Sequence, residues 1–279
     1  MTGEGPGSGA LALFARLLAQ DPVPLDEAAL AIAEEEYPGL EPDIYLTRLD
    51  DLAARVVGRA PRRAGAMLRA LREVVHEEDG LRGNPADYQD PRNSYLNEVL
   101  DRRLGIPITL SVVYLEVARR AGLRLEGVGF PGHFLVKYVC PSGAEVFLDP
   151  FHGGELLSAE ECVARHRART GGRPLDPRYL RGVSSRQILG RMLGNLRRIW
   201  LERRDDFRLY GVLDRILLVA PGQLEALRDR GLVAARLGGT SAARRDLEAY
   251  LRQAPAAIDA KAVRAVLDGL AGGRGGLLN

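Results

Sequence analysis

A change of hydrophobic period in the middle of the chain constrains its fold more than any other feature. On both sides of residues 124–149, apolar side chains recur every three or four positions, as in amphipathic helices. Within that range, residues 133–140 and 144–149 have strand-like patterns and are joined by a Pro-Ser-Gly turn, which predicts a hairpin. A hairpin between long helical segments is typical of an α+β protein, and we expect that fold class.

The turn also decides which side chains share a face of the hairpin. A three-residue loop, with Gly143 in the left-handed conformation, places Cys140 opposite Ala144. His133 and Asp149 then lie on one face as diagonal neighbours about 7–8 Å apart, within reach of a hydrogen bond between imidazole and carboxylate. A two-residue loop would put them on opposite faces, so this prediction depends on the turn type.

Helical patterns account for most of the remaining chain. The sequence before residue 83 predicts four helices, and the turn-rich segment 83–94 precedes a short helix that Ser94 would cap. A Gly-Ile-Pro sequence then introduces a strongly apolar helix, with Pro107 in its first turn and Gly122 at its end.

The C-terminal part contains an internal repeat. Pro221 and Pro255 are 34 residues apart, and apolar and acidic residues before them match at the same offset. A period of 34 residues is typical of tetratricopeptide repeats, in which Gly231 would be a small-residue position and Leu247 a large apolar one. A helical bundle with a chance spacing of prolines is the alternative.

These patterns divide the chain into four parts. We expect a flexible tail over 1–9 and an α+β domain over 10–172, with its core over 81–154. A helical repeat region would follow over 183–270, and a second flexible tail over 271–279.

Composition narrows the classes of function. A net charge of +2 gives no basic surplus for nucleic acid, so we expect no direct nucleic-acid partner. No stretch approaches about 18 consecutive apolar residues, so we expect no membrane span. The two cysteines cannot form a disulfide framework, which predicts a cytoplasmic location. Only Lys137 and Lys261 are lysines, and we interpret the excess of arginine first as genome composition.

Several segments together resemble a known family. They are Leu81-Arg-Gly-Asn, Asp90-Pro-Arg-Asn-Ser-Tyr-Leu-Asn-Glu-Val-Leu, Gly105-Ile-Pro-Ile-Thr-Leu-Ser, Phe130-Pro-Gly-His-Phe-Leu-Val and Leu148-Asp-Pro-Phe. They are similar to the transglutaminase-like domain of the bacterial SirB-type family, which typically carries C-terminal tetratricopeptide-like repeats. A related domain occurs in an F-box protein of animals. The resemblance spans roughly residues 25–270 and implies a papain-like transglutaminase core with an N-terminal helical layer and an all-α C-terminal region.

The resemblance also implies a Cys-His-Asp site, of which this chain keeps two members. His133 and Asp149 match the family's histidine and aspartate, whereas Pro107 stands at the position of the cysteine. The chain therefore resembles a pseudoenzyme. We expect a non-catalytic interaction or regulatory protein that binds a protein or peptide through the remnant cleft and the helical repeats.

Ser111 provides the alternative, because it lies one turn after Pro107 on the same helix face. With His133 as base and Asp149 as the group that orients it, Ser111 would make the protein an amide or ester hydrolase or an acyl transferase. The other interpretation of Ser111 is a hydroxyl that bonds back to the carbonyl of Ile106 or Pro107.

Other polar residues near the core helix have weaker signals. Asn93 and Asn97 are candidate ligand-binding residues, and the alternative is that they satisfy loop backbone groups. We expect Cys140 to point away from the His–Asp face and Cys162 to be buried and inert.

The three remaining histidines are candidate surface residues, and one of them, His152, is also a candidate metal ligand. His152 lies in a loop and is expected to be exposed, and His76 and His166 are expected on the surface of helices. Because no His-x-x-x-His or Cys-x-x-Cys spacing occurs, we expect no metal site, and the sequence indicates no cofactor.

Overall fold

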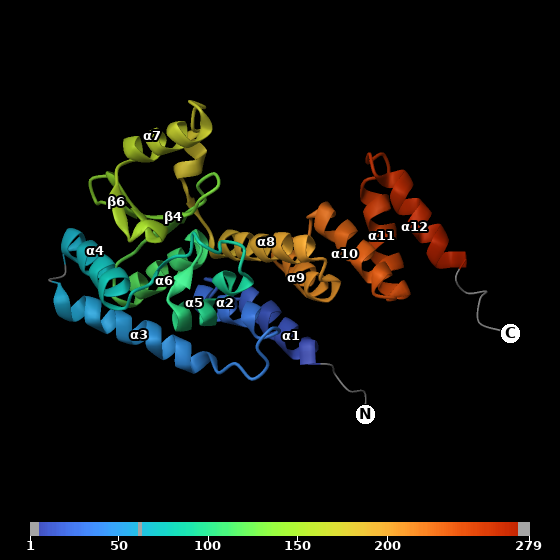
Figure 1. The fold of residues 1–279 in the computed structure, drawn as a ribbon, viewed down its shortest axis with the longest axis horizontal. Coiled ribbons are helices and arrows are strands. Elements are labelled where there is room, and N and C mark those ends of the chain that lie inside the picture. Colours follow the sequence, from blue (N-terminus) through green and yellow to red (C-terminus); the bar gives the residue numbers. More distant parts are fainter. Residues whose placement is uncertain (1–5, 61–62, 273–279) are drawn as a thin grey trace. The chain divides into compact units, whose positions relative to one another are not determined.

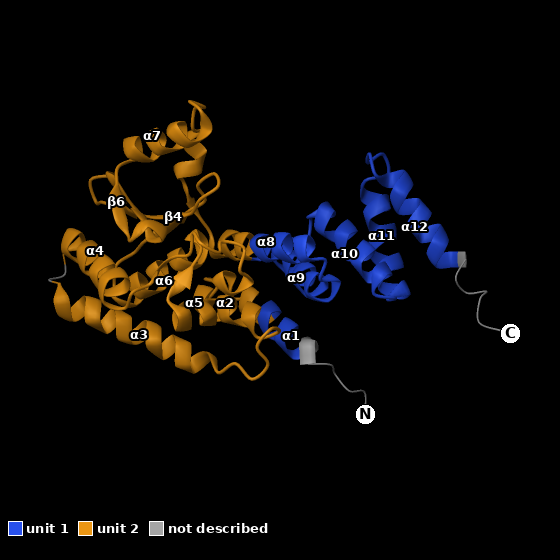
Figure 2. Cartoon of the chain, in the orientation of Figure 1, with its two compact units in different colours: residues 1–15, 193–279 blue, residues 16–192 orange. Residues whose placement is uncertain are grey.

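The computed structural model describes residues 6–60 and 63–272 (Figure 1). The chain forms two compact units: a larger unit of residues 16–192, and a repeat unit of residues 1–15 and 193–279 (Figure 2). Both predicted tails are partly helical, because the first helix begins at Pro6 and the last ends at Gly272. The rest of each tail lies outside the described residues.

Helices dominate the larger unit, as the sequence predicts. The helices of residues 16–192 are α2 (Leu25–Ala33), α3 (Pro42–Arg59), α4 (Ala64–Arg72), the π-helix η1 (Glu73–Glu78), the 3-10 helix η2 (Pro91–Ser94), α5 (Leu96–Arg102), α6 (Pro107–Arg120), the 3-10 helix η3 (Pro150–His152), α7 (Ala159–Thr170) and the 3-10 helix η4 (Pro177–Leu180). Two further helices, α1 (Pro6–Leu18) and α8 (Ser185–Arg203), each contribute residues to both units.

The described residues form two sheets. One is a parallel pair of β1 (Arg82–Gly83) and β2 (Leu104–Gly105). The other is antiparallel with strand order β6-β5-β4-β3-β7. Its strands are β3 (Glu126–Val128), β4 (Leu135–Val139), β5 (Glu145–Asp149), β6 (Glu155–Leu157) and β7 (Gly182–Val183). The α+β class is therefore confirmed, although the sequence did not predict β1, β2, β6 or β7.

The β4–β5 hairpin has the predicted register. The Cys140 amide donates to the Ala144 carbonyl at 2.7 Å, and Gly143 has a φ of 86°. Farther along the hairpin, Val136 is paired with Leu148. The three-residue loop, and with it the assignment of residues to the two faces, is confirmed.

The two faces of the antiparallel sheet contact different helices. α7 lies on one side of the sheet and α6 on the other (Figure 1). The buried cluster on the α7 side contains residues of the sheet and of the segments that cover it: Val128, Phe130, Leu135, Phe147, Leu157, Cys162 and Leu175. Since Leu135 and Phe147 belong to the same face as His133 and Asp149, that face looks toward α7.

The cap predicted for the short helix is wrong. α5 begins at Leu96 with Tyr95 as its N-cap residue, and Ser94 instead ends η2 with its hydroxyl buried and unpartnered. The Asp90 side chain makes the local cap one turn earlier, because it accepts a hydrogen bond from the Arg92 amide at 3.0 Å. The Asp-Pro sequence therefore starts a 3-10 turn that includes Ser94, the residue expected to cap the helix.

The repeat unit confirms the tetratricopeptide pattern. After α8 it contains α9 (Asp206–Val219), α10 (Leu224–Arg236), α11 (Thr240–Gln253) and α12 (Ala260–Gly272). Pro221 lies between α9 and α10, and Pro255 lies between α11 and α12. A side chain at Gly231 would place its Cβ 2.7 Å from the Leu247 side chain, so the small residue permits the close approach of α10 and α11.

Arg230 links three helices of the repeat unit. From α10 its guanidinium contacts Asp214 on α9 at 2.7 Å and Asp246 on α11 at 2.6 Å. Asp246 is 2% exposed, and the Arg230 guanidinium donates to both of its carboxylate oxygens. Part of the arginine content therefore has a structural role as well as a compositional origin.

No described helix combines the length and apolar character required to cross a bilayer.

Replacing Arg230 by alanine should destabilise the repeat unit by about 3 kcal/mol, because it leaves the buried Asp246 carboxylate with only the exposed Arg245, at 3.3 Å, as a charged partner. Trp200 is the single tryptophan of the chain and lies in this unit, so urea unfolding followed by its fluorescence measures the change. Arg178→Ala, which removes an exposed pair with Asp176, is the matched control and should leave the midpoint unchanged. Equal midpoints for both variants would show that the buried pair is dispensable.

Candidate functional site

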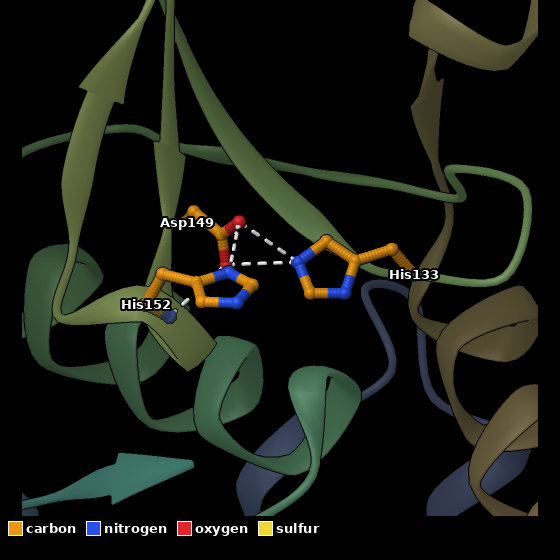
Figure 3. Close-up of side chains that lie close together, drawn as sticks. All are labelled: His133, Asp149 and His152. Atoms are coloured by element: carbon orange, nitrogen blue, oxygen red, sulfur yellow. Dashed lines mark hydrogen bonds and ion pairs between the residues drawn. The ribbon is translucent and has the colours of Figure 1, made fainter. Parts of the chain in front are cut away.

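The hairpin brings His133 and Asp149 together at its open end. Nε2 of His133 lies 2.8 Å from Oδ1 and 2.9 Å from Oδ2 of Asp149 (Figure 3). Asp149 is the last residue of β5 and is 3% exposed, whereas His133 precedes β4 and is half-buried. The contact between imidazole and carboxylate predicted from the register is confirmed.

Two arginines hold the turn that carries His133. Gly132 has a φ of 66°, in the left-handed region that glycine adopts readily. Arg169 donates to the carbonyl of Pro131, and Arg191 donates to the carbonyl of His133 at 3.0 Å. The backbone on both sides of the glycine is therefore fixed, and the imidazole is directed toward the carboxylate.

His152 is a third member of the cluster. The Asp149 carboxylate caps η3 by accepting hydrogen bonds from the amides of Phe151 and His152 at 3.2 and 3.3 Å. The same turn brings Nδ1 of His152 to 2.8 Å from Oδ2 (Figure 3). The His152 side chain is 58% exposed, as expected, but the sequence argument did not predict that it contacts Asp149. An Asp-Pro-x-His sequence that forms a 3-10 turn is the signal that was missed.

Two glycines fix the chain after His152. Gly153 and Gly154 have φ values of 71° and 70°, so any other residue would be strained there. A Cβ on Gly153 would lie 2.8 Å from Nε2 of His76, and one on Gly154 would lie 2.5 Å from the Tyr114 hydroxyl. His76 was expected on the surface; it is half-buried, and its Nδ1 lies 3.0 Å from the Leu81 carbonyl oxygen.

A cavity of about 170 Å³ opens onto the cluster on the α7 side of the sheet. It is lined by residues of the β3–β4 connection, the sheet, η3 and α7: Phe130, His133, Leu135, Asp149, His152, Leu157, Cys162, Arg165 and Arg169. The lining thus combines four apolar side chains with two imidazoles, one carboxylate and two guanidinium groups.

α7 contributes two buried residues near this cavity. Cys162 is 1% exposed, as predicted, and burial raises the pKa of its thiol to about 11. The prediction that His166 lies on the surface is wrong, because its ring packs edge-on against Phe130 at 6.0 Å and is 7% exposed. The helical pattern did not show that this face of α7 covers the sheet.

Ser111 is engaged within its own helix. Its side chain is fully buried, and its hydroxyl donates to the Pro107 carbonyl at 2.7 Å. Pro107 is the first residue of α6, as the sequence predicts. The hydroxyl therefore makes the backbone hydrogen bond that was the alternative to a catalytic role, and Ser111 is outside the described lining of the cavity.

The two candidate asparagines are also buried. Asn93 accepts from the Asn84 side chain at 3.1 Å and donates to the Asp87 carbonyl at 2.7 Å. Asn93 is 0% and Asn97 4% exposed, and both are outside the described lining of the cavity. For Asn93 the contacts match the alternative role of satisfying loop groups.

The charge of Asp149 is stabilised by its neighbours. Burial alone would raise the pKa of this carboxyl, but hydrogen bonds and favourable charge interactions with His133 and His152 outweigh it and hold the pKa below its usual value. The carboxylate is therefore ionised at neutral pH, between two imidazole rings.

Sequence comparisons agree with this architecture. A family model for the transglutaminase-like superfamily matches residues 43–194, and a tetratricopeptide repeat model matches residues 196–268. A UPF0162 protein of Xylella fastidiosa is 42% identical over 248 residues, which cover 87% of this chain and 88% of the relative. F-box only protein 21 of Mus musculus is 33% identical over 178 residues, 58% of this chain and 26% of the relative. No solved structure matches the chain.

Bacterial relatives cover both parts of the chain. A UPF0162 protein of Pseudomonas aeruginosa is 32% identical over 237 residues, 84% of this chain and 86% of the relative. The family model and these relatives show that the chain belongs to the transglutaminase-like superfamily and carries C-terminal tetratricopeptide repeats.

Asp149→Asn should lower the free energy of unfolding by about 2 kcal/mol at pH 7, because it removes the charged acceptor of two imidazoles and two amides. The folded pKa of Asp149 is depressed, so its contribution is present above the unfolded value of about 3.9 and is lost as pH falls through the folded pKa. Urea unfolding followed by circular dichroism should therefore show the difference from wild type shrinking between about pH 5 and pH 2. Asp51→Asn, on an exposed part of α3, controls for the loss of one charge. A difference that stays constant with pH would contradict this role.

The two cysteines should differ in reactivity. Iodoacetamide at pH 8 should modify the half-buried Cys140 and leave Cys162 unmodified, because the thiol of Cys162 is buried and its pKa is about 11. Mass spectrometry of the labelled peptides measures both sites, and labelling in urea provides the fully reactive control. Rapid native labelling of Cys162 would mean that its thiol is accessible from the cavity.

Proposed function

We propose that this member of the transglutaminase-like superfamily binds a protein partner and does not transfer acyl groups. The observation that carries the proposal is the hydrogen bond from the buried Ser111 hydroxyl to the Pro107 carbonyl. Ser111 is the nucleophile that the catalytic alternative requires, and this hydrogen bond engages its hydroxyl within the helix.

Acyl transfer through a covalent intermediate requires a nucleophile next to a base. Pro107, which the resemblance aligns with the family cysteine, has no nucleophilic atom, and Ser111 is held by its own helix. Cys162 faces the cavity, but with a pKa of about 11 its thiol is protonated near neutral pH. These three observations favour a structural or binding role for His133 and Asp149.

The repeat unit supplies a surface for a partner. Tetratricopeptide repeats stack helix pairs, and the exposed faces of the stack are typically used to bind proteins. Leu201 on α8 is 55% exposed, and Phe207 at the start of α9 is 71% exposed. Large apolar side chains on both sides of one helix connection favour contact with another protein at this end of the repeats.

A double variant, Leu201→Glu with Phe207→Glu, should reduce recovery of the partner at least tenfold in affinity capture after cross-linking in native cells. Both side chains are exposed, so the fold should survive, which the fluorescence of Trp200 will report. Ile44→Glu is the matched control, because Ile44 is 59% exposed on α3 of the larger unit and its replacement should leave recovery unchanged. The recovered partner is then purified and titrated with each variant.

The same capture with His133→Ala tests the absence of catalysis. Mass spectrometry should find the partner unmodified with wild type and with His133→Ala, in similar amounts. A partner that is cleaved or acylated only by wild type, or trapped only by His133→Ala, would contradict the proposal. Equal capture by the double variant and Ile44→Glu would exclude the α8–α9 connection as the binding surface.

A further inference from the structure

We propose that His133, Asp149 and His152 form a binding site for a divalent transition metal, and that Zn²⁺ is the ion it suits. The three ligand atoms lie within 4.8 Å of one another (Figure 3). The proposal is independent of the proposed function, because it concerns what the larger unit binds and not which protein the repeats contact. It replaces the expectation of no metal site, which rested on sequence spacing alone.

The donor set favours a transition-metal ion over Ca²⁺ or Mg²⁺. Two imidazole nitrogens and one carboxylate oxygen suit Zn²⁺, whereas Ca²⁺ and Mg²⁺ prefer sites made only of oxygen atoms. Three protein ligands leave one tetrahedral position for water or another small ligand. The cavity of about 170 Å³ lies beside the cluster, where that fourth ligand would enter.

The carboxylate is already directed at both rings. Oδ2 of Asp149 lies 2.9 Å from Nε2 of His133 and 2.8 Å from Nδ1 of His152. Oδ1 accepts the two backbone amides of η3, which fixes the orientation of the carboxylate as hydrogen bonds around metal ligands do. Each neutral imidazole needs only to carry its proton on the other ring nitrogen to present a lone pair to the ion.

The distances require a small adjustment. Zn²⁺ at about 2.0–2.1 Å from each ligand atom separates tetrahedral ligands by roughly 3.3 Å, about 0.5 Å more than the present contacts between nitrogen and oxygen. The side chain of His152 is 58% exposed and has space to rotate. Its backbone is fixed by Gly153 and Gly154, so the ring moves while its attachment stays in place.

Two guanidinium groups affect the choice of the fourth ligand. Arg165 and Arg169 line the same cavity. Arg165 is neutralised by Glu155 at 2.7 Å, whereas Arg169 donates to the Pro131 carbonyl. The charge of Arg169 therefore favours an anionic ligand at the open position, such as a carboxylate or hydroxide, over a neutral one.

The test is a titration of the untagged, chelator-treated full chain with Zn²⁺ in competition with a chromophoric chelator. Wild type should bind one Zn²⁺ per chain. His152→Ala should weaken binding at least tenfold, and its exposure makes this variant safe for the fold. His76→Gln removes an imidazole outside the cluster and should bind as wild type does. His133 and His152 are the two histidines of the cluster, so we also titrate His133→Ala, which should weaken Zn²⁺ binding as His152→Ala does.

A second measurement identifies the ligands. Co²⁺ in place of Zn²⁺ should give the visible absorption of a tetrahedral site without the near-ultraviolet band of a thiolate ligand. A thiolate band would replace His152 by Cys162 in the ligand set and overturn the assignment. Absence of stoichiometric binding, or equal affinity of wild type and His152→Ala, would also overturn it. Neither result bears on capture of the partner, so failure here is distinguishable from failure of the proposed function.

Discussion

The buried carboxylate of Asp149 needs hydrogen-bond donors on every side, because an ionised group away from water is costly unless it is paired. It finds two backbone amides in η3 and two imidazoles, one before β4 and one at the end of η3. One side chain thus ties the hairpin to the turn that follows it. The cluster that faces the cavity beside α7 is therefore arranged around this carboxylate.

The contact between His133 and Asp149 was predictable from the sequence because it depends only on the geometry of one hairpin. A turn of defined length and the alternation of side chains along two strands are enough to place His133 beside Asp149. His152 was not predictable in the same way, because its position depends on a 3-10 turn and on two left-handed glycines after it. Sequence motifs for metal sites describe ligands that lie close together on one helix or in one short loop. Here the proposed ligand His133 precedes β4, whereas Asp149 ends β5 and His152 follows it.

The errors on the helical side have two different physical causes. Helical periodicity identifies which residues form a face, but it does not say which partner covers that face. His166 is buried because α7 packs across the sheet. The Ser94 error is local instead, because Asp90 starts a 3-10 turn just before α5. The tetratricopeptide pattern was predictable because it recurs every 34 residues in the sequence. Within it, Gly231 is the small residue at the point where α10 approaches Leu247 of α11. Long-range packing is what a single sequence leaves open.

The two ends of the β4–β5 hairpin differ in how well they tolerate changes in chain length. Its tip, around Gly143, is exposed and has space around it, and it is at the opposite end of the strands from Asp149. Extra residues inserted at the tip would lengthen the loop, and the buried side chains of β4 and β5 would still hold the pairs below it in register. A label or a foreign loop could therefore be carried there without reaching the cluster. One added residue between Asp149 and Gly153 would move His152 off the turn that holds it, so the chain tolerates changes in length at one end of the same hairpin and not at the other.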